Sequence, residues 1–227
     1  MPPGASAAGI FVTGTDTGVG KTVAACALLR RWAAKGALAV GMKPVAAGIA
    51  AGAACNEDVA ALAAAGNVDA PLDLRNPFAF APAIAPHLAA AEAGVRIELA
   101  RIRDAYAVLA ARADRVVVEG AGGAYVPLDA RQDMLDIASA LSLPVVLVVA
   151  VRLGCLNHAL LSAHAIRARG LAFAGWVANL VDPDMARIDA NLLALDERLP
   201  APRIATLAWG RPEAPHWGPG AATLGLE

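Results

Sequence analysis

Residues 14–22, GTDTGVGKT, constrain the fold of this chain more than any other stretch of its sequence. They directly follow the apolar, β-branched run 10–13 and open a helical pattern over residues 22–34. A strand, a glycine-rich loop and a helix in this order are typical of a phosphate-binding loop, in which backbone N–H groups converge on phosphate oxygens at the helix N-terminus. The sequence therefore predicts a nucleotide-binding α/β fold.

Two residues of this loop carry the chemistry that we expect of it. Lys21 would reach the β- and γ-phosphates of a nucleotide, and the Thr22 hydroxyl would bind Mg²⁺. The alternative is a glycine-rich turn that only links a strand to a helix. The first glycine stands six residues before Gly20, one more than the usual loop allows, so the loop is a variant that argues against the ordinary kinases and GTPases.

Strand and helix patterns alternate along the rest of the chain. Strands are predicted at residues 37–45, 115–119, 144–151, 174–179 and 203–207, and helices at 98–113, 134–141, 156–169 and 185–199. This alternation predicts an α/β fold: one P-loop NTPase-like domain over residues 1–227, with a mostly parallel sheet and helices on both faces. We expect the proline-rich residues 66–87 to be irregular, and the tail from Gly210 to lie across the surface.

Composition excludes several classes of protein. A formal net charge of −1 argues against nucleic-acid binding, which needs a basic face. The longest apolar run, residues 143–151, is shorter than the roughly 20 residues that cross a bilayer, and the amino-terminal segment lacks the basic region of a signal peptide. The cysteines, which suit a reducing cytoplasm and exclude a disulfide scaffold, are Cys26, Cys55 and Cys155.

Lysine usage singles out a second basic residue. Of the 19 lysines and arginines, only Lys21, Lys35 and Lys43 are lysines. Because the chain uses arginine at almost every other basic position, a lysine indicates a position that needs a compact point charge rather than a planar guanidinium. Lys43 ends a predicted strand, at the sheet edge where ligands of open α/β folds bind. The alternative is a solvated lysine at a strand end. Lys35, near the end of a predicted helix, is expected to be a surface charge.

Two acids are candidate Mg²⁺ ligands. Glu119 ends the buried run 116–118 and precedes a glycine-rich stretch, as in the second metal-binding element of P-loop nucleotidases. Mg²⁺ prefers oxygen ligands, and an unpaired structural glutamate at this place would be costly. Asp58 would lie in a first helical turn, where an acid also suits the helix dipole without any metal.

Two asparagines also have two interpretations each. Asn179, at the end of a predicted strand, could read a purine edge or could form a turn. Asn157, near the start of a predicted helix, could bind a carboxylate with the helix N-terminus or could only cap the helix.

Seven segments in order, covering nearly the whole chain, resemble the dethiobiotin synthetase family of biotin synthesis. They are FVTGTDTGVGKT (11–22), MKPVAAG (42–48), NEDVA (56–60), APHLAAAEAG (85–94), VVVEGAGG (116–123), RLGCLNHA (152–159) and AGWVAN (174–179). The resemblance implies that 7,8-diaminononanoate, CO₂ and MgATP give dethiobiotin through a carbamate and a carbamic-phosphoric anhydride. It also implies a cytoplasmic homodimer with the diamine site at the interface.

The resemblance further implies roles for individual residues of this chain. The catalytic residues are Lys43, Lys21 and Thr17, and the Mg²⁺ ligands are Thr22, Asp58 and Glu119. The ATP-binding residues are Gly18, Val19, Gly20, Lys21, Thr22, Val23, Asp58, Glu119, Gly120, Ala121, Gly122, Asn179, Leu180, Ala208 and Trp209. The diamine-binding residues are Thr17, Lys43, Ala47, Gly154 and Asn157.

The chain departs from the family pattern at three places. Ala47 stands where the family often has serine, Asn191 where some members have tyrosine, and Leu207-Ala208-Trp209 where IPW is common. These departures concern substrate affinity and nucleotide preference more than the reaction.

Two other functions remain as alternatives. Partitioning and cell-division ATPases carry a lysine early in the loop, where this chain has Asp16, and no terminal basic amphipathic helix is present for a membrane surface. An amidoligase of the cobyrinate type needs a glutaminase domain, for which 227 residues are too few.

Overall fold

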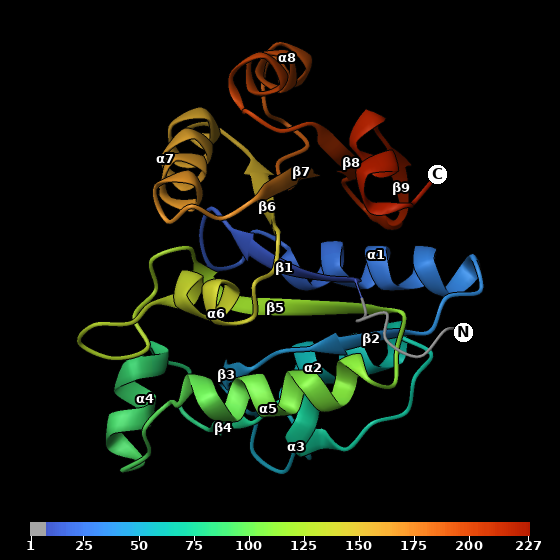
Figure 1. Cartoon of the computed structure of the whole chain (residues 1–227). Helices are drawn as coiled ribbons and strands as arrows, with labels where there is room; N and C mark the ends of the chain where they lie inside the picture. Colours follow the sequence, from blue (N-terminus) through green and yellow to red (C-terminus); the bar gives the residue numbers. More distant parts are fainter. Residues whose placement is uncertain (1–7) are drawn as a thin grey trace.

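The computed structural model describes residues 8–227. The amino-terminal segment for which the sequence predicts no signal peptide includes residues 1–7, which lie outside the described residues. Strands and helices alternate along the chain (Figure 1). The strands are β1 (Ala8–Gly14), β2 (Ala39–Met42), β3 (Val45–Ala47), β4 (Phe78–Phe80), β5 (Arg115–Gly123), β6 (Val145–Val151), β7 (Phe173–Leu180), β8 (Arg203–Ala208) and β9 (Arg211–Trp217). The helices are α1 (Lys21–Ala34), α2 (Glu57–Ala65), α3 (Leu72–Arg75), α4 (Pro86–Glu92), α5 (Leu99–Ala110), α6 (Met134–Ala140), α7 (Cys155–Ala168), α8 (Ile188–Arg198) and the 3₁₀ helix η1 (Pro219–Leu224).

Seven strands form one sheet in the order β2-β5-β1-β6-β7-β8-β9, parallel except for the antiparallel pair β8–β9. Side chains of β6 alternate between the two faces. Leu147 and Val149 pack in the cluster that includes α5, α6, α7 and α8, whereas Val146 and Val148 pack with α1 and α2. The predicted α/β fold, with a mostly parallel sheet covered on both faces, is confirmed.

The second predicted strand ends earlier than expected, so the prediction of one strand over residues 37–45 is wrong. β2 ends at Met42, and Val45 begins β3, which pairs with β4 in a separate two-stranded sheet. Between these strands, the Lys43 N–H donates to the Arg75 carbonyl (2.8 Å) and the Lys43 carbonyl accepts from Asn76 Nδ2 (2.7 Å). Because the backbone N–H and carbonyl of Lys43 have hydrogen-bond partners outside the large sheet, the chain leaves this sheet after Met42.

The carboxyl-terminal tail is more ordered than the sequence suggests. It forms β9 and η1, and Leu226 is 0% exposed. The Trp32 indole donates to the Leu224 carbonyl (2.9 Å) and Arg31 Nε to the Leu226 carbonyl (2.8 Å), which holds the tail beside α1 (Figure 1). Most of the tail is exposed, as expected, but it is held there as an edge strand, a position that tolerates its prolines.

Smaller differences affect the site. β5 continues through the glycines to Gly123 instead of ending at Glu119. α7 begins at Cys155 after Gly154, whose φ of 94° supplies the N-cap conformation, so Asn157 lies in the first turn and does not cap the helix. Residues 66–87 contain only α3, β4 and the start of α4. Among the described residues, no helix is long and apolar enough to cross a bilayer.

Candidate active site

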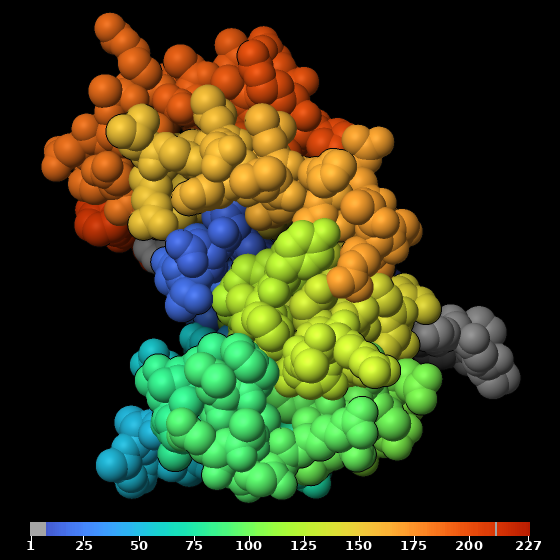
Figure 2. Space-filling view, turned by 90° about the vertical axis from the view of Figure 1, so that its left-hand side faces the viewer, coloured from blue at the N-terminus to red at the C-terminus, as the bar shows by residue number. Residues whose placement is uncertain are grey.

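The carboxyl ends of the parallel strands gather most of the predicted site residues at one edge of the sheet. Figure 2 shows this side, where a blue segment from the beginning of the described chain is exposed between gold and yellow-green segments. The strand register pairs Met42 with Val118 and Val12 with Glu119. Lys43, which follows Met42, therefore lies beside Glu119, although the two are 76 positions apart in the sequence.

The phosphate loop connects β1 to α1 and depends on its glycines. Gly18 and Gly20 have φ values of 72° and 87°, in the left-handed region that favours glycine. A Cβ added at Gly14 would lie 2.5 Å from Val19 Cγ2, so the loop folds closely over the end of β1. These residues form the cradle that the sequence predicts at this place.

Lys21 lies within this cradle with its ammonium buried. Nζ donates to the backbone carbonyl of Asp16 at 2.9 Å. Burial, and then the charge of nearby Lys43, lower the pKa of Lys21 from 10.5 to about 8, against the opposing effect of nearby carboxylates. An anion bound in the loop would stabilise the protonated form.

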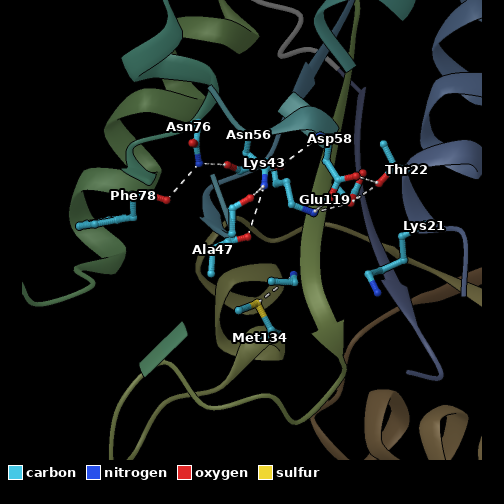
Figure 3. A network of polar contacts seen from close by, with 12 residues as sticks. Lys21, Thr22, Lys43, Ala47, Asn56, Asp58, Asn76, Phe78, Glu119 and Met134 are labelled. Carbon is cyan, nitrogen blue, oxygen red and sulfur yellow. Dashed lines mark hydrogen bonds and ion pairs between the residues drawn. The ribbon is translucent and has the colours of Figure 1, made fainter. Parts of the chain in front are cut away.

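Lys43 lies at the centre of a charged cluster beside the loop (Figure 3). Its Nζ is 2.5 Å from Glu119 Oε1 and 3.0 Å from Asp58 Oδ2. Thr22 Oγ1 lies 2.8 Å from Asp58 Oδ1 and 2.9 Å from Glu119 Oε1, and its single hydrogen can be donated to one of them at a time. We call Thr22, Lys43, Asp58 and Glu119 the lysine–carboxylate cluster.

The charged groups of this cluster shift one another's pKa values. Burial by itself would lower the pKa of Lys43, but Glu119 and Asp58 outweigh that effect and raise this pKa above its ordinary value. Burial, the largest single effect, would raise the pKa of Asp58. The charge and hydrogen bond of Lys43, together with the Thr22 hydrogen bond and the charge of Lys21, lower this pKa below its ordinary value. Within the cluster two carboxyl groups thus face one ammonium, and Lys21 supplies a second positive charge nearby.

The oxygen atoms of this cluster fit a divalent metal ion. Mg²⁺ is usually bound through one or two carboxylates together with phosphates and water. Glu119 Oε2 is buried and has no hydrogen-bond partner among residues 8–227, so one strong acceptor is left unused. Thr22, Asp58 and Glu119 are therefore chemically suited to the Mg²⁺ that the sequence predicts.

Two buried asparagines that the sequence reasoning missed support the cluster. Asn56 caps α2: its Oδ1 accepts from the Asp58 N–H at 3.0 Å, and its Nδ2 donates to the carbonyls of residues 47 and 48. Asn76 binds the Lys43 carbonyl. An asparagine directly before an acidic first turn is an N-cap pattern, which could have identified Asn56. No local signal marks Asn76.

Residues predicted to bind the nucleotide base lie at the ends of β7 and β8 and directly after β8. Asn179 Nδ2 donates to the Val19 carbonyl at 2.9 Å, so this side chain contacts the phosphate loop and does not merely form a turn. Asn179 pairs with Leu207, which places Ala208 and Trp209 beside the end of β7. The Trp209 side chain is 60% exposed there.

The other predicted residues divide into two groups. Near the loop and the cluster lie Thr17, Ala47, Val23 in α1, Gly120, Ala121 and Gly122 in β5, and Leu180 in β7. Gly154 and Asn157 lie exposed at the start of α7. Within the described part of the chain, no side-chain hydrogen bond or ion pair joins these two residues to the lysine–carboxylate cluster.

Solved structures of low sequence identity share the fold. The signal recognition particle receptor FtsY from Elizabethkingia anophelis has a TM-score of 0.59 at 15% identity, over 96% of this chain and 64% of that one. FtsY from Thermotoga maritima has a TM-score of 0.54 at 15% identity, over 99% of this chain and 69% of that one. These likenesses concern the fold alone.

Closer relatives identify the family. Residues 8–212 match a family model described as an AAA domain. The ATP-dependent dethiobiotin synthetase BioD of Nitrosospira multiformis is 53% identical over 201 residues, which are 88% of each chain. The BioD of Pseudomonas paraeruginosa is 54% identical over 210 residues, 90% of this chain and 92% of that one. With these identities over nearly its full length, the chain belongs to the ATP-dependent dethiobiotin synthetases, a family of ligases.

Proposed function

We propose that this chain carboxylates 7,8-diaminononanoate with CO₂ and closes the ring to dethiobiotin at the expense of ATP, as a step of biotin biosynthesis. The observation that carries the proposal is the lysine–carboxylate cluster beside a phosphate loop, in a chain whose relatives are called dethiobiotin synthetases.

The proposed reaction has three balanced steps. One amine adds to CO₂ and loses a proton, which gives a carbamate. A carbamate oxygen attacks the γ-phosphorus of ATP and ADP leaves, which gives a carbamic-phosphoric anhydride. The second amine then attacks the carbonyl carbon, loses a proton and expels phosphate, which closes the five-membered urea.

In this proposal the protein contributes alignment and charge neutralisation rather than acid–base chemistry. Lys21 and the loop N–H groups hold the phosphates, while Thr17 and Lys43 face the transferring group. The buried ammonium of Lys43 is well placed for this role, because a charge in a water-excluded site acts more strongly than one in solvent. Thr22, Asp58 and Glu119 would hold Mg²⁺, which supplies additional positive charge at the phosphates.

We also infer that the protein works as a homodimer in the cytoplasm. Leu153, next to Gly154, is 95% exposed, which supports a contact with a second copy at the start of α7. In this arrangement Gly154 and Asn157 of one subunit meet the diamine bound at Lys43 of the other. Three free cysteines support a reducing compartment.

Phosphate release tests the reaction. With ATP and Mg²⁺ present, we expect release to require both the diamine and bicarbonate, and mass spectrometry to find one dethiobiotin for each phosphate. Phosphate release that does not depend on the diamine but increases with DNA or lipid would instead indicate a nucleotide switch. Release that depends on glutamine would indicate an amidoligase.

Subunit mixing tests the shared site. Lys43→Gln and Asn157→Ala subunits are each expected to form weakly active dimers. After random reassociation, half of the dimers contain one of each subunit and thus one intact site of two, so about a quarter of the wild-type activity should return. No recovery in mixed dimers, verified by mass, would contradict a site built from two subunits.

A further inference from the structure

Asn179 makes a contact that recognition of a base does not require. Its Nδ2 donates to the carbonyl of Val19, in the middle of the phosphate loop, at 2.9 Å. The two residues are 160 positions apart in the sequence. This hydrogen bond joins the loop to β7, which lies inside the sheet between β6 and β8.

Both ends of this hydrogen bond are held by their surroundings. The backbone of Asn179 pairs with Ala150 on one side and with Leu207 on the other. The Val19 side chain is buried and packs against the backbone at Gly14. The contact therefore joins two positions whose conformational entropy is already reduced by the fold.

Gly20 leaves the space that the contact needs. A Cβ added to Gly20 would lie 2.1 Å from Asn179 Nδ2, closer than real atoms approach. The φ of Gly20 is also 87°, which is strained for any other residue. This glycine thus serves both the left-handed turn and the approach of the Asn179 amide.

The geometry of the peptide bond links this contact to phosphate binding. No cis peptide bond occurs among the described residues, so the Val19 carbonyl and the Gly20 N–H point in opposite directions. Asn179 holds the carbonyl, and the Gly20 N–H consequently points away from Asn179. Backbone N–H groups of such a loop are the groups that bind phosphate oxygens.

We infer that Asn179 is a positioning residue of the phosphate loop, because it holds the Val19 carbonyl in place. The affinity of the loop for the triphosphate chain should therefore depend on the Asn179 side chain, whichever base the nucleotide carries. The inference rests on the nucleotide site of the proposed function. Asn179 Oδ1 and the second hydrogen of Nδ2 make no hydrogen bond within residues 8–227, so the same amide can still meet a base. Base recognition and phosphate alignment are then coupled through one residue.

Inorganic tripolyphosphate, which has no base, is the probe that separates the two roles. Its affinity in the presence of Mg²⁺ is measured by displacement of a fluorescent ATP analogue, in parallel with that of ATP. We expect Asn179→Ala and Asn179→Leu each to weaken tripolyphosphate binding about five- to tenfold, as for the loss of one hydrogen bond. Asn179→Leu nearly keeps the size of the side chain, has no N–H to donate and adds no charge that would repel phosphate, so it covers the case in which the alanine variant does not fold.

Trp209→Ala is the matched control, because Trp209 lies on the base side and makes no hydrogen bond to the loop within the structure described. It should weaken ATP binding and leave tripolyphosphate binding unchanged. If folded Asn179 variants lose ATP affinity but keep tripolyphosphate affinity within twofold, or if tripolyphosphate does not enter the wild-type site, the positioning role is wrong. A wild-type protein that binds neither the ATP analogue nor ATP would instead contradict the nucleotide site of the proposed function.

Discussion

The lysines of the chain have very different surroundings, so the role of Lys43 can be tested with an exposed lysine as the control. Lys43 is buried between Asp58 and Glu119, whereas Lys35 is exposed at the end of α1. Lys43→Gln keeps most of the side-chain volume and removes the positive charge. We expect turnover to fall by at least about 100-fold, since one preorganised charge at the transferring group is worth this much.

In the same Lys43→Gln variant we expect ATP affinity to change only a few-fold, because the phosphate loop is unaltered. Steady-state turnover and nucleotide titration measure the two effects, and the unfolding midpoint shows whether the variant remains folded. Lys35→Gln should behave as the wild type in both measurements. Near-normal turnover of folded Lys43→Gln would remove Lys43 from the proposed mechanism.

The three thiols also differ in accessibility and are expected to differ in reactivity. Cys26 and Cys155 are buried, and burial raises the pKa of the Cys26 thiol to about 11. Cys55 is half-buried in the segment before α2. Since the thiolate is the reactive form, iodoacetamide at pH 8 should modify Cys55 in the folded protein, and Cys26 and Cys155 only after unfolding.

Peptide mass spectrometry after timed labelling reports each cysteine separately. Labelling of native Cys26 as fast as that of Cys55 would contradict the burial of α1 against the sheet. Labelling in urea provides the reference in which all three thiols react.

At the scale of elements, α2 depends on its cap. Asn56 binds the Asp58 N–H and also the carbonyls of residues 47 and 48, so it joins the helix to β3. Asn56→Ala removes a cap and also one hydrogen-bond donor to these two carbonyls. We expect the free energy of unfolding to fall by about 2 kcal/mol. The orientation of Asp58 should suffer as well, which would weaken Mn²⁺ binding measured by electron paramagnetic resonance.

Urea unfolding measures the stability change, and Asn157→Ala is the control. Asn157 is exposed and makes no side-chain hydrogen bond within residues 8–227, so its replacement should change stability by less than about 0.5 kcal/mol. Equal effects of the two substitutions would show that the cap contributes little.

At the scale of the whole molecule, the last residues complete the core. Leu226 is one residue from the carboxyl end, yet it is 0% exposed and packs in the cluster beside α1. Leu226→Ala should lower the free energy of unfolding by about 2–4 kcal/mol, the usual cost of emptying a core leucine site. Leu193→Ala, at a side chain that is 59% exposed, is the control and should be nearly neutral.

Calorimetric or urea unfolding of both leucine variants checks this expectation.

The tail holds α1, which begins with Lys21 and Thr22, so removal of residues 218–227 should weaken nucleotide binding as well as stability. A truncated protein with the wild-type unfolding midpoint would mean that the tail contacts are dispensable.

The sequence by itself determined the fold class and singled out the candidate site residues. A glycine-rich loop, a lysine after it and alternating strand and helix patterns are local signals, because backbone conformation and side-chain period are set by neighbouring residues. These signals predicted the phosphate loop, the parallel sheet and the importance of Lys43 and Glu119. They misplaced the end of β2 and missed β9, where a distant partner satisfies the backbone.

The tertiary structure alone decided how these residues meet. Strand register brings Lys43 to Glu119 across 76 positions, and Asn179 reaches Val19 across 160. Asn56, Asn76 and Leu226 acquire their roles in the same way, through contacts with parts of the chain far from them in sequence. A polar or apolar side chain does not specify its partner locally, since that partner is chosen when the sheet and the helices pack together.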